Sequence, residues 1–558
     1  MSKALGAHGT PGATTSSGMT GTAPTDPFAG TDATLNARVR RRRRSGWART
    51  LGVAILAAAI AFAAGFAVGR TGPGGTAPEH AGTAADTVVV GLKLAPVNLD
   101  IRRQSGNAVM QLLIGNVYEG LVGRDSHNRV VPAIADSWDI AKDGLAYTFH
   151  LRQGLTFSNG DVLDATDVVW SIRQMIERQY YDYEQLDGVT GVEALDDHTV
   201  RLTLDTPNAN LLWYLSARPG LVFDQDAHYD PKTQAVGSGP YLVSDFVPND
   251  SVTLTANPNY TGRNPAKTHT VVVRYLTDAN AAVNALTSGA VQVLSPIDEQ
   301  LAAPLKNDPA YTIRAGNGSD KYVLAMNNRR APFTDKRVRQ AIRYAIDHKQ
   351  IIAARGGADQ PLGGPIPAVD PGYRDLTGLY PHDVAKAQEL MRQAGYGPDH
   401  HLTTTLTYAN TYGTELGDQL RSQLAAIWID LKIDYVEFST WLTDVHQNAD
   451  YDLSLVDHAE SHDFEQWADP TYYYGYDNPR VQELYRKAMA ATDEKTTDRL
   501  LAQAARQVSE DAAADWLFAY RVTTATAQGV SGFAADLSQS FMPLWNLTYV
   551  RPAEGGAA

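Results

Sequence analysis

The chain has 558 residues, of which 44% are hydrophobic and 20% are charged, and its formal net charge at pH 7 is -14. This is the composition of an ordinary globular protein, and the length allows two or more packed cores, which excludes one small domain. The chain contains no cysteine, which excludes disulfide bonds, thiolate metal sites, a cysteine nucleophile and an anchor built on a lipid-modified cysteine.

The first 86 residues predict a leader, a membrane segment and a linker. Residues 1–50 begin with a stretch poor in large apolar side chains and end in an arginine cluster, which predicts a disordered cytoplasmic leader. Residues 51–69 are an uncharged run of 19, long enough to span a hydrocarbon core, and the arginines place its N-terminal side in the cytoplasm. Residues 70–86 are typical of a flexible tether. A cleaved secretory signal with its site near residues 81–85 is the alternative, and either way the rest of the chain is exported.

The charge is divided unevenly along the chain. Residues 1–70 carry a net charge of +7, which leaves -21 for the remainder. A phosphate backbone is bound by a basic stripe, and we find none in this acidic body. Nucleic acid is therefore excluded as a partner.

The exported body opens with elements of mixed type. Residues 87–92 and 146–151 predict strands, and residues 155–157 predict a further strand that leads into a turn at Asn159-Gly160. Asp164 then precedes an amphipathic run and has Asp167 three residues after it, which predicts a helix with a capping box.

A second set of elements begins near residue 319. Residues 322–326 predict a strand, and the stripe Val338, Ala341, Ile342, Ala345 and Ile346 predicts a helix with Thr334 as its N-cap. The pattern then predicts a strand at residues 402–408, a helix at 416–427 and a strand at 431–435. Such a βαβ unit builds a parallel sheet, so the sequence predicts two α/β assemblies.

Several motifs, in order, resemble those of one family, the extracellular solute-binding proteins of the oligopeptide, dipeptide and nickel type (family 5), which serve ABC importers. The block formed by residues 132–138 and 143–152 is the most specific of them. The other matching segments are residues 117–122 (VYEGLV), 157–160 (FSNG), 165–168 (ATDV), 237–241 (GSGPY) and 332–341 (PFTDKRVRQA).

The resemblance implies a two-lobed periplasmic-binding-protein-like α/β fold of type II, with an enlarged first lobe and hinge strands between the lobes. We expect the first lobe at residues 87–318, completed by 524–552, and the second at 319–523. The implied function is capture of a peptide or peptide-like ligand between the lobes, by a monomer that needs no cofactor, and delivery to ABC transporter permease subunits. Closure works because the ligand bridges surfaces that meet only in the closed state.

The resemblance also implies ligand-binding residues. By position Asp463 matches an aspartate that meets the amino terminus of the ligand, and a carboxylate in a closed cleft forms a strong charge-assisted bond to an ammonium. Capping of a short helix is the alternative role for Asp463. His458 and His462 depart from the family pattern, and as an i, i+4 pair on a helix they could bind a metal, although solvated or hydrogen-bonded histidines are commoner.

Four further residues are candidates for the cleft. Asn327 matches a family position whose amide hydrogen-bonds ligand backbone, and a turn at the strand end is the alternative. Trp213 and Trp441 could form walls of the cleft, although core packing is the better interpretation for a large aromatic. Tyr474 belongs to a cluster of four tyrosines at residues 472–476, which we expect not to pack inward together.

Two other functions compete with uptake. An anchored sensor that binds a peptide or a metal chelate without import would have the same fold. A secreted hydrolase using two carboxylates is a remote alternative, since we find no G-x-S-x-G, H-E-x-x-H or phosphate-binding glycine loop. The sequence therefore predicts a binding protein and not an enzyme.

Overall fold

The computed structural model describes residues 83–104, 106–536 and 540–552. The predicted leader, the run at 51–69 and most of the tether lie outside these residues. Residues 83 and 84, which we expected in the tether, form strand β1 (Thr83–Ala84), which pairs with β21 (Thr548–Arg551). Among the described residues, no helix is both long and apolar enough to cross a membrane.

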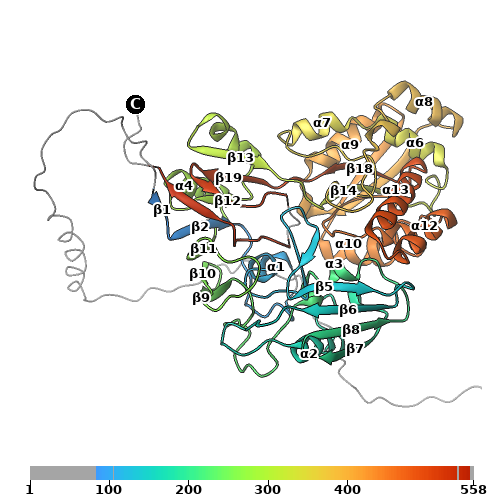
Figure 1. The fold of residues 1–558 in the computed structure, drawn as a ribbon. Helices are drawn as coiled ribbons and strands as arrows, with labels where there is room; N and C mark the ends of the chain where they lie inside the picture. Colours follow the sequence, from blue (N-terminus) through green and yellow to red (C-terminus); the bar gives the residue numbers. More distant parts are fainter. Residues whose placement is uncertain (1–82, 105, 537–539, 553–558) are drawn as a thin grey trace, which may run out of the picture. The chain divides into compact units, whose positions relative to one another are not determined.

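The first lobe contains a mixed seven-stranded sheet (Figure 1). Its central strand β2 (Thr87–Leu92), which the sequence predicted, pairs in parallel with β11 (Thr270–Tyr275) and β12 (Val293–Ser295). The remaining strands are β9 (Tyr241–Val247), β10 (Ser251–Ala256), β13 (Tyr311–Ala315) and β19 (Thr523–Ala527), and the helices along this part of the chain are α1 (Asn107–Leu113), α4 (Ala279–Thr287) and α5 (Glu299–Ala302).

An antiparallel four-stranded sheet enlarges the first lobe. Its order is β5 (Ala135–Ile140), β6 (Ala146–Leu151), β8 (Thr199–Leu204) and β7 (Val189–Asp196). Helix α2 (Ala165–Glu177) packs against it and begins with the predicted capping box of Asp164 and Asp167. The predicted strand at 155–157 is wrong, because only Thr156 makes an isolated bridge, to Val162. Smaller elements of this lobe are β3 (Val122–Arg124), β4 (Val130–Pro132), α3 (Leu211–Tyr214) and β20 (Val530–Ser531).

The second lobe has a five-stranded sheet in the order β16 (Ile429–Val436), β15 (Leu402–Ala409), β17 (Leu453–His458), β14 (Lys321–Met326) and β18 (Ala514–Ala519). The predicted βαβ unit is confirmed, since β15 and β16 are parallel and α9 (Glu415–Ala425) connects them. The other helices are α6 (Lys336–Ala345), α7 (His348–Ala354), α8 (Val384–Gln393), α10 (Phe438–Trp441), α11 (Glu465–Ala468), α12 (Pro479–Met489) and α13 (Glu494–Glu510).

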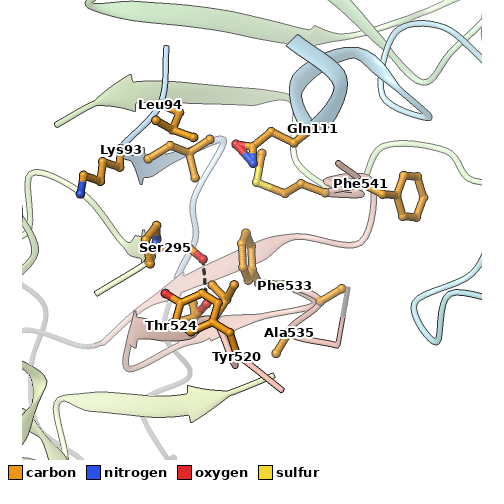
Figure 2. Close-up of a pocket in the computed structure, with 14 residues that line it drawn as sticks. Lys93, Leu94, Gln111, Ser295, Tyr520, Thr524, Phe533, Ala535 and Phe541 are labelled. Atoms are coloured by element: carbon orange, nitrogen blue, oxygen red, sulfur yellow. Dashed lines mark hydrogen bonds between the residues drawn. The ribbon is translucent and has the colours of Figure 1, made fainter. Parts of the chain in front are cut away.

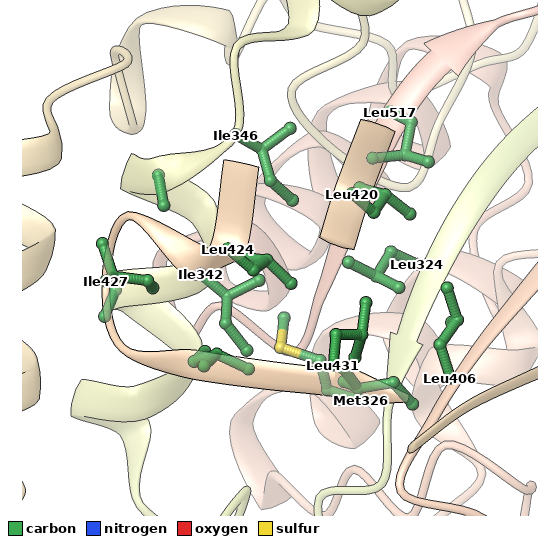
Figure 3. Packing of buried hydrophobic residues seen from close by; sticks show 14 of the residues in the cluster. Leu324, Met326, Ile342, Ile346, Leu406, Leu420, Leu424, Ile427, Leu431 and Leu517 are labelled. Atoms are coloured by element: carbon green, nitrogen blue, oxygen red, sulfur yellow. The ribbon is translucent and has the colours of Figure 1, made fainter. Parts of the chain in front are cut away.

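Both faces of this second sheet are buried. Along β14, Leu324 and Met326 face one apolar cluster, while Val323 and Ala325 face another. Figure 3 shows the first cluster, in which Ile342 and Ile346 from the predicted stripe meet Leu420 and Leu424 of α9. This alternation buries side chains on two sides of one strand and explains why β14 reads as a continuous apolar run.

Helix α6 begins one residue later than predicted. Asp335, and not Thr334, is its N-cap, and the carboxylate of Asp335 accepts a hydrogen bond from the backbone N–H of Arg337 at 2.9 Å. The same carboxylate also accepts a hydrogen bond from the guanidinium of Arg337, which further stabilises Asp335 at the N-cap. The helix itself is confirmed.

The glycine motif at 237–241 is held by close backbone contacts. A Cβ at Gly239 would lie 2.6 Å from the carbonyl oxygen of Asn116, a backbone atom that cannot move cheaply. We expect Gly239→Ala to lower the free energy of unfolding by about 2 kcal/mol, as overpacking does. Chemical denaturation measures this, with Gly378→Ala as the control, because no atom lies within 4 Å of a Cβ there. Equal stability of the two variants would contradict the argument.

Candidate functional site

The chain crosses between the lobes twice, at residues 316–320 and 520–522. The two crossings run side by side, because the N–H of Gly316 donates to the carbonyl of Val522 and the N–H of Tyr520 donates to that of Asp320, both at 3.0 Å. Each crossing continues antiparallel pairs on either side, β13 with β19 and β14 with β18. Two short adjacent segments of this kind form a hinge.

A cavity of about 280 Å³ lies beside this hinge (Figure 2). It is at the carboxyl ends of the parallel neighbours β2 and β12, the edge where open α/β sheets bind ligands. Figure 2 shows the residues that line the cavity, among them Gln111 of α1 and Phe533. The lining is formed by Leu92, Lys93, Leu94, Gln111, Ser295, Pro296, Tyr520, Val522, Thr524, Phe533, Ala534, Ala535, Phe541 and Met542.

The cavity is mainly apolar, with a few uncharged polar groups and one charged residue, the exposed Lys93. The hydroxyls of Ser295 and Thr524 hydrogen-bond each other at 2.8 Å across strands β12 and β19. A pocket with apolar walls and a few polar groups is the usual form of a small-molecule site. None of these residues was singled out in the sequence, because the parallel pairing that brings the ends of β2 and β12 together was not visible there.

Away from the hinge, the lobes meet through a ring stack. The ring of Trp213 in α3 lies on the imidazole of His462 with centroids 4.1 Å apart and planes inclined by 16°. Beside the stack, the amide of Asn210 donates to the carbonyl of His462 at 3.4 Å, and the N–H of Ala209 donates to the carbonyl of Met489 at 3.0 Å. The stack therefore belongs to a closed arrangement of the lobes.

A guanidinium links this stack to the cavity. The side chain of Arg124 is buried, and its guanidinium carbon lies 4.6 Å from the ring centroids of both Trp213 and Phe541. Phe541 in turn lines the cavity. Burial lowers the pKa of Arg124 to about 9, so the group stays charged at neutral pH. Cation–π contacts of this kind are stronger when they are shielded from water.

The loop after β17 carries buried charges. Asp463 accepts a salt bridge from the ammonium of Lys321 at 3.1 Å, and the two side chains are only 10% and 3% exposed. Burial raises the pKa of Asp463 to about 7, and Glu460 and Asp370 add to the rise while Lys321 opposes it. Burial opposes the charge on Lys321, but the nearby carboxylates outweigh it and the pKa of Lys321 is raised.

The backbone of the same loop is fixed by Asp370. The N–H of His462 donates to the carboxylate of Asp370 at 3.0 Å, and the hydroxyl of Ser461 donates to the same group. His462 has a positive φ of 61°, which this anchoring sustains. Burial lowers the pKa of the His462 imidazole to about 4, so the ring that stacks on Trp213 is neutral.

Comparison with known proteins identifies this arrangement. The sequence profile of the bacterial extracellular solute-binding proteins, family 5 (middle region), matches residues 129–480, which is more than half of the chain. The chain belongs to solute-binding protein family 5. A di/tripeptide-binding protein 2 from Pseudomonas aeruginosa is 30% identical over 388 residues, 63% of this chain and 72% of that protein.

Other family 5 proteins bind different ligands. A heme-binding protein A from Haemophilus influenzae is 30% identical over 53% of this chain and 59% of its own length. The structure of the periplasmic binding protein DppA from Helicobacter pylori, in complex with the peptide STSA, matches with a TM-score of 0.67 at 24% identity over 83% of this chain and 98% of that one. That likeness shows the two-lobed fold.

In this family 5 chain the candidate residues are divided between two places. Asp463, His462 and Trp213 come together where the lobes meet, although Asp463 does not cap α11 and instead pairs with Lys321. Asn327 lies elsewhere, and its amide donates to the carbonyls of Ala449 and Tyr451 at 3.0 Å each. Trp441 is buried and donates to the hydroxyl of Ser454 at 2.9 Å. The ligand contacts of these residues stay predictions.

Three of the four tyrosines in the cluster pack inward and Tyr472 is half-buried, so the four do not all pack inward together. Tyr473, Tyr474 and Tyr476 are buried, and the Tyr474 ring stacks on Trp467 with centroids 4.2 Å apart. Trp467, in α11, provides the aromatic surface on which Tyr474 packs. The hydroxyl of Tyr474 also lies 2.6 Å from Nε2 of His458, which gives a buried tyrosine a polar partner.

The two histidines do not form a pair on a helix. His458 ends strand β17, and His462 lies in the turn after it. Ligand atoms of His458, Glu460 and Asp463 come within 4.8 Å of one another, but the ammonium of Lys321 already bonds to the Asp463 carboxylate of that group. The arrangement is that of a buried ion pair.

Proposed function

We propose that this chain captures a peptide or peptide-like ligand between its two lobes outside the cytoplasmic membrane and delivers it to the permease subunits of an ABC importer. The observation that carries the proposal is the cavity at the hinge, since its lining includes Tyr520 and Val522 from a crossing. Movement about a hinge alters the surfaces beside it, so a ligand bound there can favour one arrangement of the lobes. The peptide-binding relative from Pseudomonas aeruginosa supports the ligand class.

The rest of the proposal concerns how the protein is held and used. Residues 51–69 anchor a monomer to the membrane, and 87–318 with 524–552 and 319–523 act as the two lobes. The ligand is held without being altered, so the protein is not an enzyme. Membrane fractionation of the full chain, with N-terminal sequencing of the product, separates an anchor from a cleaved leader. A ligand recovered in a cleaved form would overturn the binding role.

The ligand itself can be identified directly. We expect native mass spectrometry of the purified chain to detect a small bound molecule, which denaturation releases for sequencing or fragmentation. A peptide or an amide-linked molecule supports the proposal. A heme or a metal complex as the bound molecule would replace it with another family 5 ligand class.

The stack between the lobes gives a test of closure. We expect Trp213→Ala to weaken ligand binding about tenfold, or about 1.4 kcal/mol, because the closed state loses a ring contact that the open state does not make. Calorimetry with the recovered ligand measures this. Trp138→Ala in β5 is the control, since Trp138 packs inside the first lobe and we expect its affinity to match the wild type. Unchanged affinity for Trp213→Ala would contradict the role of the stack.

A further inference from the structure

Lys321 has an unusual position for a lysine. It is the first residue of β14 and is 2% exposed. Its ammonium donates to the carbonyl of Glu460 at 2.7 Å, to the carbonyl of Ser319 at 3.1 Å and to the carboxylate of Asp463. An ammonium has three donors, so all three are used within the chain. The group is a fixed part of the loop that carries His462 and Asp463.

Little room remains beside Asp463. Its Oδ2 accepts from Lys321 and also from the amide of Gln466 at 3.3 Å. The free space next to it, lined by residues that include Asn210 and His462, measures about 10 Å³. That is space for about one water molecule. A second ammonium, from a ligand, lacks the space to lie beside this carboxylate while the ammonium of Lys321 is there.

The hinge cavity, unlike the space beside Asp463, is large and mainly uncharged. Its volume of about 280 Å³ approaches that of a small-ligand site, and its walls are mainly apolar. The polar side chains of Gln111, Ser295 and Thr524 carry no charge. Lys93 is exposed, and in Figure 2 its ammonium points away from the cavity. Placing an unpaired ammonium against such walls would cost desolvation energy without a counter-charge.

We propose that Lys321 determines specificity: its ammonium takes the position at Asp463 that a ligand ammonium would otherwise fill, so the chain selects compact peptide-like ligands without a free amino group. The apolar part of such a ligand occupies the hinge cavity. The inference rests on the proposed function, because it names the ligand class of the same cleft.

The test uses two ligands that differ in the amino group alone, leucyl-leucine amide and N-acetyl-leucyl-leucine amide. We expect the wild-type full chain to bind the acetylated form at least tenfold more tightly by calorimetry. Lys321→Met keeps an unbranched stem but leaves Asp463 open to a ligand ammonium, so we expect this variant to prefer the free amine. Adding Asp463→Asn to Lys321→Met should abolish that preference.

Lys336→Met is the matched control, because the ammonium of Lys336 bonds to Asp511 at 2.9 Å on the outside of the second lobe. It should keep the wild-type ratio of affinities, and so should Lys321→Arg, which retains the charge. The inference is overturned if the wild type prefers the free amine, or if Lys321→Met leaves the ratio of the two affinities unchanged. Either result leaves the proposed function intact. Failure of the wild type to bind either form counts against peptide capture itself.

Discussion

Asp515→Ala is expected to lower the free energy of unfolding by about 3–5 kcal/mol, the usual loss when one partner of a buried ion pair is removed. Asp515 lies in β18 with no exposed surface. Its carboxylate is 3.0 Å from Nε2 of His348 and 3.6 Å from Nε of Arg343, whose side chain is 3% exposed. Without the carboxylate, Arg343 stays in the core without a counter-charge there.

Chemical denaturation monitored by tryptophan fluorescence measures this loss. The matched control is Asp430→Ala, because Asp430 also pairs with a histidine, His401 at 3.1 Å, but the two side chains are 59% and 39% exposed. An exposed pair contributes little, so we expect a change of less than about 1 kcal/mol there. Similar losses of stability in the two variants would show that burial does not determine the contribution of Asp515.

The second large effect is acid sensitivity through His458. This side chain is buried between the hydroxyls of Tyr473 and Tyr474, and burial lowers its pKa from 6.5 to about 3. Below pH 6.5 the unfolded chain therefore binds a proton that the folded chain does not. The contribution of neutral His458 is complete above pH 6.5 and is lost as the pH falls toward 3.

We expect His458→Gln to reduce the loss of stability between pH 6.5 and 4.5 by about 2–3 kcal/mol relative to the wild type, since each pH unit in this range corresponds to about 1.4 kcal/mol for one proton. Glutamine keeps an oxygen that can accept from Tyr474. Denaturation midpoints at a series of pH values give the slopes, and His401→Gln, at an exposed histidine, should keep the wild-type slope. Parallel slopes for His458→Gln and the wild type would contradict a neutral His458.

Asp463 affects the pH dependence of stability in the direction opposite to His458, over a pH range that overlaps with that of His458. Its pKa is raised to about 7, so the folded chain holds a proton between pH 3.8 and 7 that the unfolded chain has lost, and this contribution decreases as the pH rises through that range. The slope of the wild type is therefore a balance of several groups, which also include His462, whose pKa is lowered to about 4. For this reason His458 is tested as a difference between variant and wild type.

Local patterns in the sequence determined much of the secondary structure. The capping box at Asp164, the apolar stripe from Val338 to Ile346 and the alternation of residues 402–408 each involve residues within a few turns or one strand of one another. Their physics is local, so periodicity and capping chemistry are sufficient to predict them. The ordered family motifs extended this to the two-lobed fold and to membership of family 5.

The tertiary structure alone decided which side chains meet at the cleft. Lys321 and Asp463 are 142 positions apart in the chain, and Trp213 meets His462 across two lobes. No local pattern distinguishes Asn327, whose amide donates to a backbone carbonyl of its own lobe, from a residue that faces a ligand, and the stacking of Tyr474 on Trp467 is likewise decided by packing. Contacts of this kind depend on how distant elements pack, so a motif predicts where Asp463 lies but not that a lysine already occupies its carboxylate.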